Sequence, residues 1–104
     1  MNGMDRRLKL HDELLSIFNQ NVYYQPPESI KLSYPCLIYE LSSGQKNSAD
    51  NLLYLFTRRY TCTYITRDSE HDLIEKVLMH FRHASYDRRF VTDNLYHDVF
   101  TIYY

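Results

Sequence analysis

The stretch that decides the fold is YLFTRRYTCTYI, residues Tyr54–Ile65. Apolar or aromatic side chains alternate there with threonine and arginine. Successive side chains of a β-strand point to opposite faces of a sheet, so this alternation predicts a strand with one buried and one solvated face. The inward set is Phe56, Tyr60, Cys62 and Tyr64, and the outward set is Thr57, Arg59, Thr61 and Thr63.

Arg58 interrupts this alternation, because it occupies the same parity as Phe56 and Tyr60. An unpaired guanidinium inside a core is very costly. We therefore expect either that this end of the strand leaves the core or that a carboxylate from elsewhere meets Arg58. Both readings make Arg58 a candidate interface residue.

Before this strand, one helix and two strands are expected. The helix covers Met4–Gln20, where apolar residues recur at helical spacing. Val22–Gln25 predicts a short strand ahead of two prolines, and Cys36–Leu41 is a near-continuous apolar run, typical of a strand covered on both faces. The stripe expected to face the core from the helix is Met4, Leu8, His11, Leu15 and Phe18, widened by Leu14.

The loop Ser42–Asn51 is polar and, at about ten residues, longer than most connections in small domains. With the apolar Leu52 and Leu53 at its exit, it is expected to be mobile in the free protein and ordered in an assembly. After the central strand, Ser69 predicts the N-cap of a second helix whose core stripe contains Leu73, Ile74, Val77, Leu78 and Phe81.

Two strands, Arg88–Thr92 and Leu95–Tyr104, close the chain, and Asp93-Asn94 between them suits a two-residue hairpin turn. The order of elements predicts one α+β domain over residues 1–104. Its sheet is mostly antiparallel or mixed, with four to five strands, and two helices pack on one face.

Charge and composition exclude several classes of protein. Twelve Lys and Arg against thirteen Asp and Glu leave a net charge of −1, which argues against a protein that mainly grips phosphate backbones. The chain has no apolar run of the roughly 18 residues that a membrane span needs, and Met1–Lys9 lacks a signal-peptide pattern. Folding in a cytoplasm is therefore expected, without membrane contact. Cys36 and Cys62 are expected to be free, buried thiols, with a disulfide or a metal pair with histidine as the alternatives.

No set of residues predicts catalysis, a cofactor site or a metal site. His80 and His83 are three apart rather than four and lack a third ligand, so helix-terminal positions explain them better. His97 and Asp98 are strand neighbours that point to opposite faces, so they cannot form a dyad. Arg58-Arg59 and Arg88-Arg89 split their charges between faces, which favours ion pairs over a single-stranded nucleic-acid platform.

Several strings together resemble the small tail-completion (tail terminator) proteins of tailed bacteriophages. They are YPCLIYEL at residues 34–41, Asp50-Asn51 ahead of a tyrosine-bearing strand, RYTCTYI at 59–65 running into Arg67-Asp68-Ser69, and NLYHDVFTIY at 94–103. The resemblance covers nearly the whole chain, although no single string is a mechanistic motif.

This resemblance implies a structural virion protein, assembled in the bacterial cytoplasm, that forms a ring at the head-proximal end of the tail tube. The ring, of six subunits by analogy, would cap the tube, contact the tail tube protein and dock the head-completion or connector protein. Genome DNA would pass through its lumen without sequence-specific binding. A head-completion or connector protein of the same neck, and a cytoplasmic protein-binding module unrelated to phage, remain as alternatives.

The last strand carries more apolar side chains than one covered sheet face can bury. Tyr96, Phe100, Ile102 and Tyr104 point one way, and Val99 and Tyr103 the other. Tyrosine suits a surface that is wet before assembly and buried afterwards. The alternative is a sheet covered on both sides within the monomer. The expected interface residues are Asp50, Asn51, Leu52, Leu53, Arg58, Tyr96, Phe100, Tyr103 and Tyr104.

Overall fold

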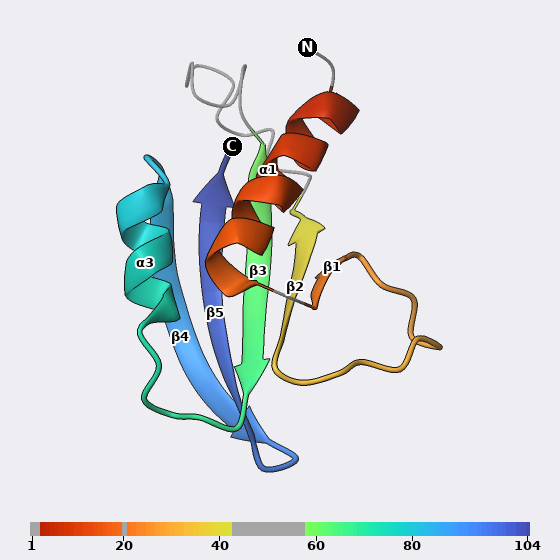
Figure 1. Ribbon diagram of the computed structural model, residues 1–104, viewed down its shortest axis with the longest axis vertical. Coiled ribbons are helices and arrows are strands. Elements are labelled where there is room, and N and C mark those ends of the chain that lie inside the picture. The colour runs from red at the N-terminus through yellow and green to blue at the C-terminus, as the bar shows by residue number, and fades with distance from the viewer. Residues whose placement is uncertain (1–2, 20, 43–57) are drawn as a thin grey trace.

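The structure, a computed structural model, describes residues 3–19, 21–42 and 58–104. Within these ranges two helices lie over one face of a five-stranded mixed sheet, which confirms the predicted α+β fold (Figure 1). The elements are α1 (Gly3–Phe18), β1 (Val22–Tyr24), β2 (Cys36–Leu41), β3 (Arg59–Thr66), α3 (Leu73–His80), β4 (Ala84–Thr92) and β5 (Leu95–Tyr103).

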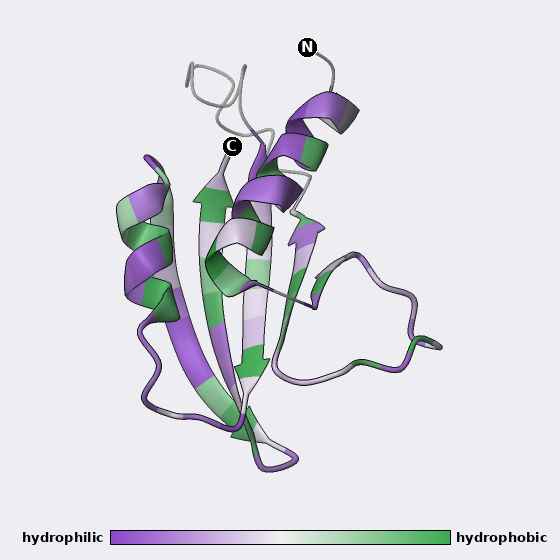
Figure 2. Cartoon of the chain, viewed as in Figure 1, coloured by the Kyte–Doolittle hydropathy of each residue, from purple (hydrophilic) through white to green (hydrophobic). Residues whose placement is uncertain are grey.

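The strands are ordered β1-β2-β3-β5-β4, so β3 and β5 lie inside the sheet and β4 forms one edge. β1 pairs with β2 in parallel, and every other pair of neighbours is antiparallel. Cys62 of β3 lies opposite Tyr39 of β2 and Phe100 of β5. Burial alternates along β5 from Asp98 to Tyr103, as expected for a strand with two different faces, and Figure 2 shows the mixture of hydrophobic and hydrophilic residues along this strand.

The main core lies between the helices and the sheet. Buried residues from α1, β2, β3, α3 and β5 form one cluster there, and Tyr39, Cys62, Val77, Phe100 and Ile102 have no exposed surface. Aromatic rings supply much of this core, because Phe18 packs against Tyr64 and stacks on Phe100. The other face carries a smaller cluster of Cys36, Ile65 and Leu95, with Leu32 packed against it.

Cys36 and Cys62 are free and buried, as predicted. They belong to the two separate clusters, and the register pairs Cys36 with Ile65 and Cys62 with Tyr39. The two thiols therefore point to opposite faces of the sheet.

The predicted hairpin turn is also confirmed. Asp93 and Asn94 connect β4 to β5 with φ of 55° and 61°. Two positive φ values in succession match the twist of the flanking strands, and Asp and Asn tolerate this region of φ/ψ space better than most residues.

Both helices differ from the prediction. α1 buries Leu10, Leu14 and Phe18, whereas Leu8 is 48% exposed and Leu15 is 36% exposed. The expected stripe was therefore right for Leu14 and Phe18 and wrong for Leu8 and Leu15, because two apolar stripes occur at helical spacing and packing buries the one that contains Leu10. α1 ends at Phe18, and Asn19 and Asn21 follow with positive φ.

α3 begins at Leu73, so Ser69 is not its N-cap. The segment before it forms a turn in which the Glu70 N–H donates to the Asp68 carboxylate. Such a side-chain turn competes with helix formation. Val77 and Phe81 are buried as predicted, although Phe81 lies just beyond the helix and Leu78 is 38% exposed.

The strand boundaries were predicted closely, except that β4 starts at Ala84 rather than at Arg88. A register shift between Tyr86 and Arg88 interrupts the alternation of inward and outward side chains. A search of the sequence for period-two alternation therefore does not detect the first half of this strand. β2 is covered on both faces only in its first half, since Glu40 is exposed. The loop expected over 42–51 and the first residues of the strand expected from Tyr54 lie outside the described residues, apart from Ser42.

Candidate interaction site

A buried carboxylate organises the surface between α3 and β4. Asp98 lies on β5 with the parity of Phe100 and Ile102, so its side chain points under the helices and is only 1% exposed. A buried charge is tolerated only when it is paired and hydrogen-bonded. The sequence around Asp98 thus requires partners from other elements.

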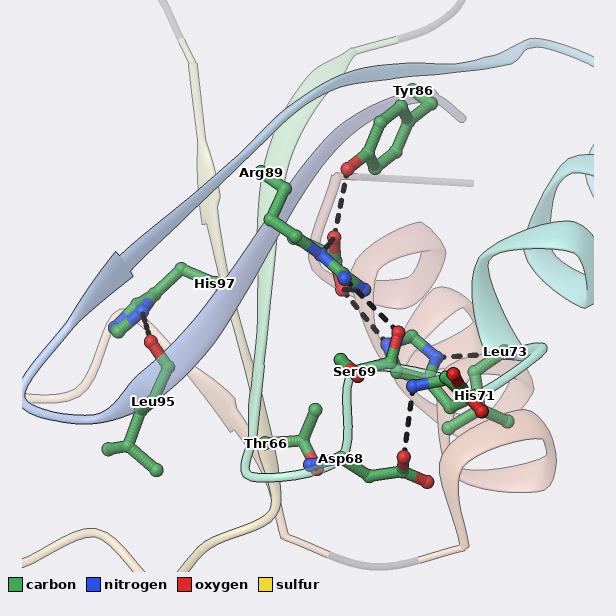
Figure 3. A network of polar contacts seen from close by, with 11 residues as sticks. Thr66, Asp68, Ser69, His71, Leu73, Tyr86, Arg89, Leu95 and His97 are labelled. Carbon is green, nitrogen blue, oxygen red and sulfur yellow. Dashed lines mark hydrogen bonds and ion pairs between the residues drawn. The ribbon is translucent and has the colours of Figure 1, made fainter.

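Four hydrogen bonds from three side chains satisfy this carboxylate (Figure 3). Arg89 of β4 donates from Nε and Nη2 at 2.8 and 3.0 Å, and the Tyr86 hydroxyl donates at 2.8 Å. His71, which precedes α3, bonds through Nε2 at 2.9 Å. Arg89 also donates from Nη1 to the Ser69 carbonyl and places its guanidinium over the Tyr96 ring.

The neighbours of His71 define its tautomer. Its Nδ1 lies 3.3 Å from the Leu73 backbone nitrogen, which can only donate. Nδ1 is therefore the acceptor, and Nε2 carries the proton that is donated to Asp98. With Nδ1 engaged at the start of α3, this pair offers no free imidazole lone pair for general-base chemistry.

The same contacts control the charge of Asp98. Burial alone would raise the pKa of its carboxyl group, but the hydrogen bonds from Arg89, His71 and Tyr86 outweigh burial, so the pKa is lowered. Asp98 is therefore ionised near neutral pH and forms a bidentate ion pair with Arg89, the geometry that arginine favours.

A cavity of about 350 Å³ opens beside this network, between α3 and β4. Its lining residues are His71, Ile74, Glu75, Leu78, Tyr86, Arg89 and Asp98. The Glu75 carboxylate forms no hydrogen bond or ion pair with any described residue. The cavity thus combines apolar walls from α3 with one unpaired negative charge.

A second polar contact joins both helices to the end of the chain. Glu13 of α1 accepts from the Tyr104 hydroxyl and bonds to His80 Nε2, the latter at 2.8 Å. Burial acts to raise the pKa of Glu13, but the hydrogen bonds from Tyr104 and His80 lower it further than burial raises it. His80 is thus held by a carboxylate. No group of three His, Cys, Asp or Glu residues that could hold a metal ion occurs within 3–19, 21–42 and 58–104.

The predicted interface residues differ in how exposed they are in the structure. Arg58 is exposed immediately before β3, where its backbone pairs with that of Tyr104, so the chain does leave the core at this end of the strand. Tyr96, Tyr103 and Tyr104 are partly buried. Phe100 was wrongly placed among surface residues, because its parity directs it beneath the helices, where it is fully buried. Asp50, Asn51, Leu52 and Leu53 lie outside the described residues.

Sequence reasoning missed the network of His71, Tyr86, Arg89 and Asp98. Asp98 carried a usable signal, because a charged residue on the parity of Phe100 and Ile102 has to be paired. The separation of His97 from Asp98 was predicted correctly, since His97 instead stacks on Phe90 on the other face, with ring centroids 4.6 Å apart. Only the tertiary structure shows that the histidine in contact with Asp98 is His71.

The chain matches no protein-family model, no curated protein and no solved structure. No helix among the described residues is long and apolar enough to cross a membrane.

Proposed function

We propose that this protein is a structural component of a phage neck, which forms a ring at the head-proximal end of the tail tube and joins the tail to the head. The observation that carries the proposal is the unequal covering of the sheet. Both helices lie on one face, and no helix among the described residues lies on the other. Together with the sequence resemblance, this favours a subunit that completes its packing in an assembly.

The face opposite the helices has the character of an assembly surface. Ile38, Val99 and Tyr103 are only partly buried there, and Phe90 is 38% exposed. Threonine and arginine side chains separate these apolar groups, so the surface stays wettable in a free subunit. Protein interfaces typically combine aromatic anchors with a polar surround.

Ring closure needs two different patches on each subunit, because a head-to-tail contact joins unlike surfaces. The sheet face opposite the helices and the solvent-exposed side of α3, where Met79 is 87% exposed, are two such patches. In the proposed ring, of six copies by analogy with tail terminators, the tail tube protein and the head-completion or connector protein occupy the two ends. The genome passes through the lumen without sequence readout, consistent with a net charge of −1.

Imaging of phage particles that carry a tagged copy of this protein tests the proposal. The expected result is one ring of label between head and tail, and averaging of the ring gives its number of subunits. Label scattered over the capsid, or no label in the virion, would contradict it. A tagged major capsid protein in a parallel preparation controls for access of the label.

Separation of heads from tails distinguishes the two kinds of neck protein. A tail-completion protein stays with tails assembled in the absence of heads, whereas a head-completion protein stays with filled heads assembled in the absence of tails. Recovery with neither, together with genes unrelated to phage on both sides of this one, would favour a cytoplasmic binding module.

A further inference from the structure

β4 has an unusual combination of length and exposure for an edge strand. It extends over nine residues, Ala84–Thr92, and all but the first are exposed. Its only hydrogen-bonded neighbour in the described sheet is β5. Alternate backbone N–H and C=O groups along its outer side are therefore available to another strand.

The cavity beside Asp98 lies directly along this edge, because Tyr86 and Arg89 of β4 form one of its walls. Ile74 and Leu78 of α3 form the opposite wall. A strand added to β4 would direct every second side chain toward α3 and the cavity. Domains that bind extended peptides use the same pairing of an open strand edge with a side-chain pocket.

The two sides of β4 present different charged groups to an added strand. On the cavity side, Arg89 is neutralised by Asp98, which leaves the unpaired carboxylate of Glu75. On the other side, Arg88 lies over the Phe90 ring at 5.4 Å and forms no ion pair with a described residue. Asp87 lies on the same side and accepts a hydrogen bond from Thr101, so the positive charge there is confined to the position of Arg88. A strand that pairs with β4 would therefore complement these charges if it carried a basic side chain on the cavity side and an acidic side chain next to Arg88.

Pairing of β4 with β4 of a second copy fits poorly. In an antiparallel pair of identical strands the two Arg88 side chains lie on the same face, and in registers centred near Arg88 they lie opposite each other, where like charges repel. Arg89 cannot supply the basic group for the partner's cavity either, since it is already committed to Asp98 and the Ser69 carbonyl.

From these observations we propose that the groove between β4 and α3 binds an extended segment of a partner protein by strand addition. The segment places a Lys or Arg side chain in the cavity, with its aliphatic stem on Ile74 and Leu78 and its charge near Glu75. The adjacent residue of the segment is an Asp or Glu that pairs with Arg88. This inference does not rest on the proposed phage function, because it concerns the isolated subunit.

A synthetic peptide tests the groove. The probe is a blocked nine-residue peptide of Thr and Val with Lys at the centre and Glu next to it. The expected result is saturable binding in NMR titrations of the labelled protein, with the largest amide shifts along β4 and increased protection of its outward N–H groups from hydrogen exchange. Replacing Glu75→Gln or Arg88→Gln is expected to weaken binding about fivefold.

Three controls make the test specific. A peptide of the same composition with Lys and Glu two residues apart puts both charges on one face, and it should bind more weakly than the probe. A peptide N-methylated on alternate amides loses strand pairing and should not bind. Glu70→Gln makes the same chemical change outside the cavity and should leave affinity unchanged.

Several results would overturn the inference. They are no shift of β4 amides at millimolar peptide, equal binding of the N-methylated peptide, or equal affinity of the Glu75→Gln and Glu70→Gln variants. A concentration-dependent dimer that already protects β4 in the absence of peptide would assign the edge to a second copy instead. None of these outcomes depends on imaging of virions, so failure here and failure of the proposed phage function are distinguishable.

Discussion

His71 donates a hydrogen bond from Nε2 to the buried carboxylate of Asp98 over 2.9 Å, although the two residues are 27 positions apart in the chain. Its other ring nitrogen accepts from the Leu73 N–H at the start of α3. One imidazole therefore joins β5 to the beginning of α3. Because Arg89 and Tyr86 bind the same carboxylate, the network also ties the edge strand β4 to this site.

Removal of the Asp98 carboxylate is expected to be strongly destabilising. Asp98→Ala leaves Arg89, His71 and Tyr86 without their acceptor, and breaking a buried pair by removing one partner costs about 3–5 kcal/mol. Urea unfolding followed by circular dichroism measures this loss. Asp72→Ala is the matched control, since Asp72 pairs with Lys76 in the open, and its change should be below about 1 kcal/mol. Equal effects of the two substitutions would show that the network contributes little.

Stability is expected to fall in acid through Asp98. The folded pKa of this carboxyl lies below its unfolded value of about 3.9, so its contribution is fully present well above that value. The contribution is lost as the pH falls through the folded pKa. Unfolding free energies between pH 6 and pH 2 should therefore drop less steeply in Asp98→Asn than in the wild type. The pKa of the Glu13 carboxyl is also lowered, so Glu13 accounts for part of the pH dependence of the unfolding free energy that remains in Asp98→Asn. Parallel profiles of the wild type and Asp98→Asn would refute the assignment.

The hydroxyl of Tyr104 is expected to stabilise the fold through Glu13. Tyr104→Phe removes this hydrogen bond while keeping the ring against Phe81, so a loss of about 1–2 kcal/mol is expected. Tyr34→Phe is the control, since the Tyr34 side chain is 39% exposed and its hydroxyl has no partner among the described residues. Thermal unfolding of both variants decides the matter, and a Tyr104→Phe protein as stable as Tyr34→Phe would contradict the expectation.

Both thiols should react slowly in the native protein. Burial raises the pKa of Cys36 to about 11, and burial followed by the nearby charge of Asp87 raises the pKa of Cys62 further. The reactive thiolate is therefore scarce at pH 8 and is also shielded from reagents. Labelling with a chromogenic disulfide should be slow in buffer and rapid in urea. Fast native labelling of both cysteines would rule out their burial.

The turn between β4 and β5 should depend on residues that accept positive φ. Asn94→Val forces a β-branched residue to φ of 61°, which is expected to cost about 1–2 kcal/mol, whereas Asn94→Gly should be neutral or stabilising. Urea unfolding compares the two variants. If valine and glycine are equally tolerated, the turn geometry is not what limits this hairpin.

The sequence by itself determined the local structure of this protein. Strict alternation identified the described part of β3, because side-chain period in a strand depends only on backbone geometry. Asp93 and Asn94 predicted their turn for a similar reason, since the residues that tolerate positive φ are few. These signals are local, so they can be read without knowing which surface an element meets.

Only the tertiary structure decided which surfaces meet. α1 carries apolar residues on two neighbouring stripes, and packing on the sheet buried Leu10 and Leu14 while leaving Leu8 and Leu15 exposed. Asp98 could be recognised from its parity as a charge that needs partners, but His71 and Arg89 reach it only because α3 and β4 are brought beside β5. Pairing across distant segments depends on the free energy of the whole packed arrangement, and no local period in the sequence encodes it.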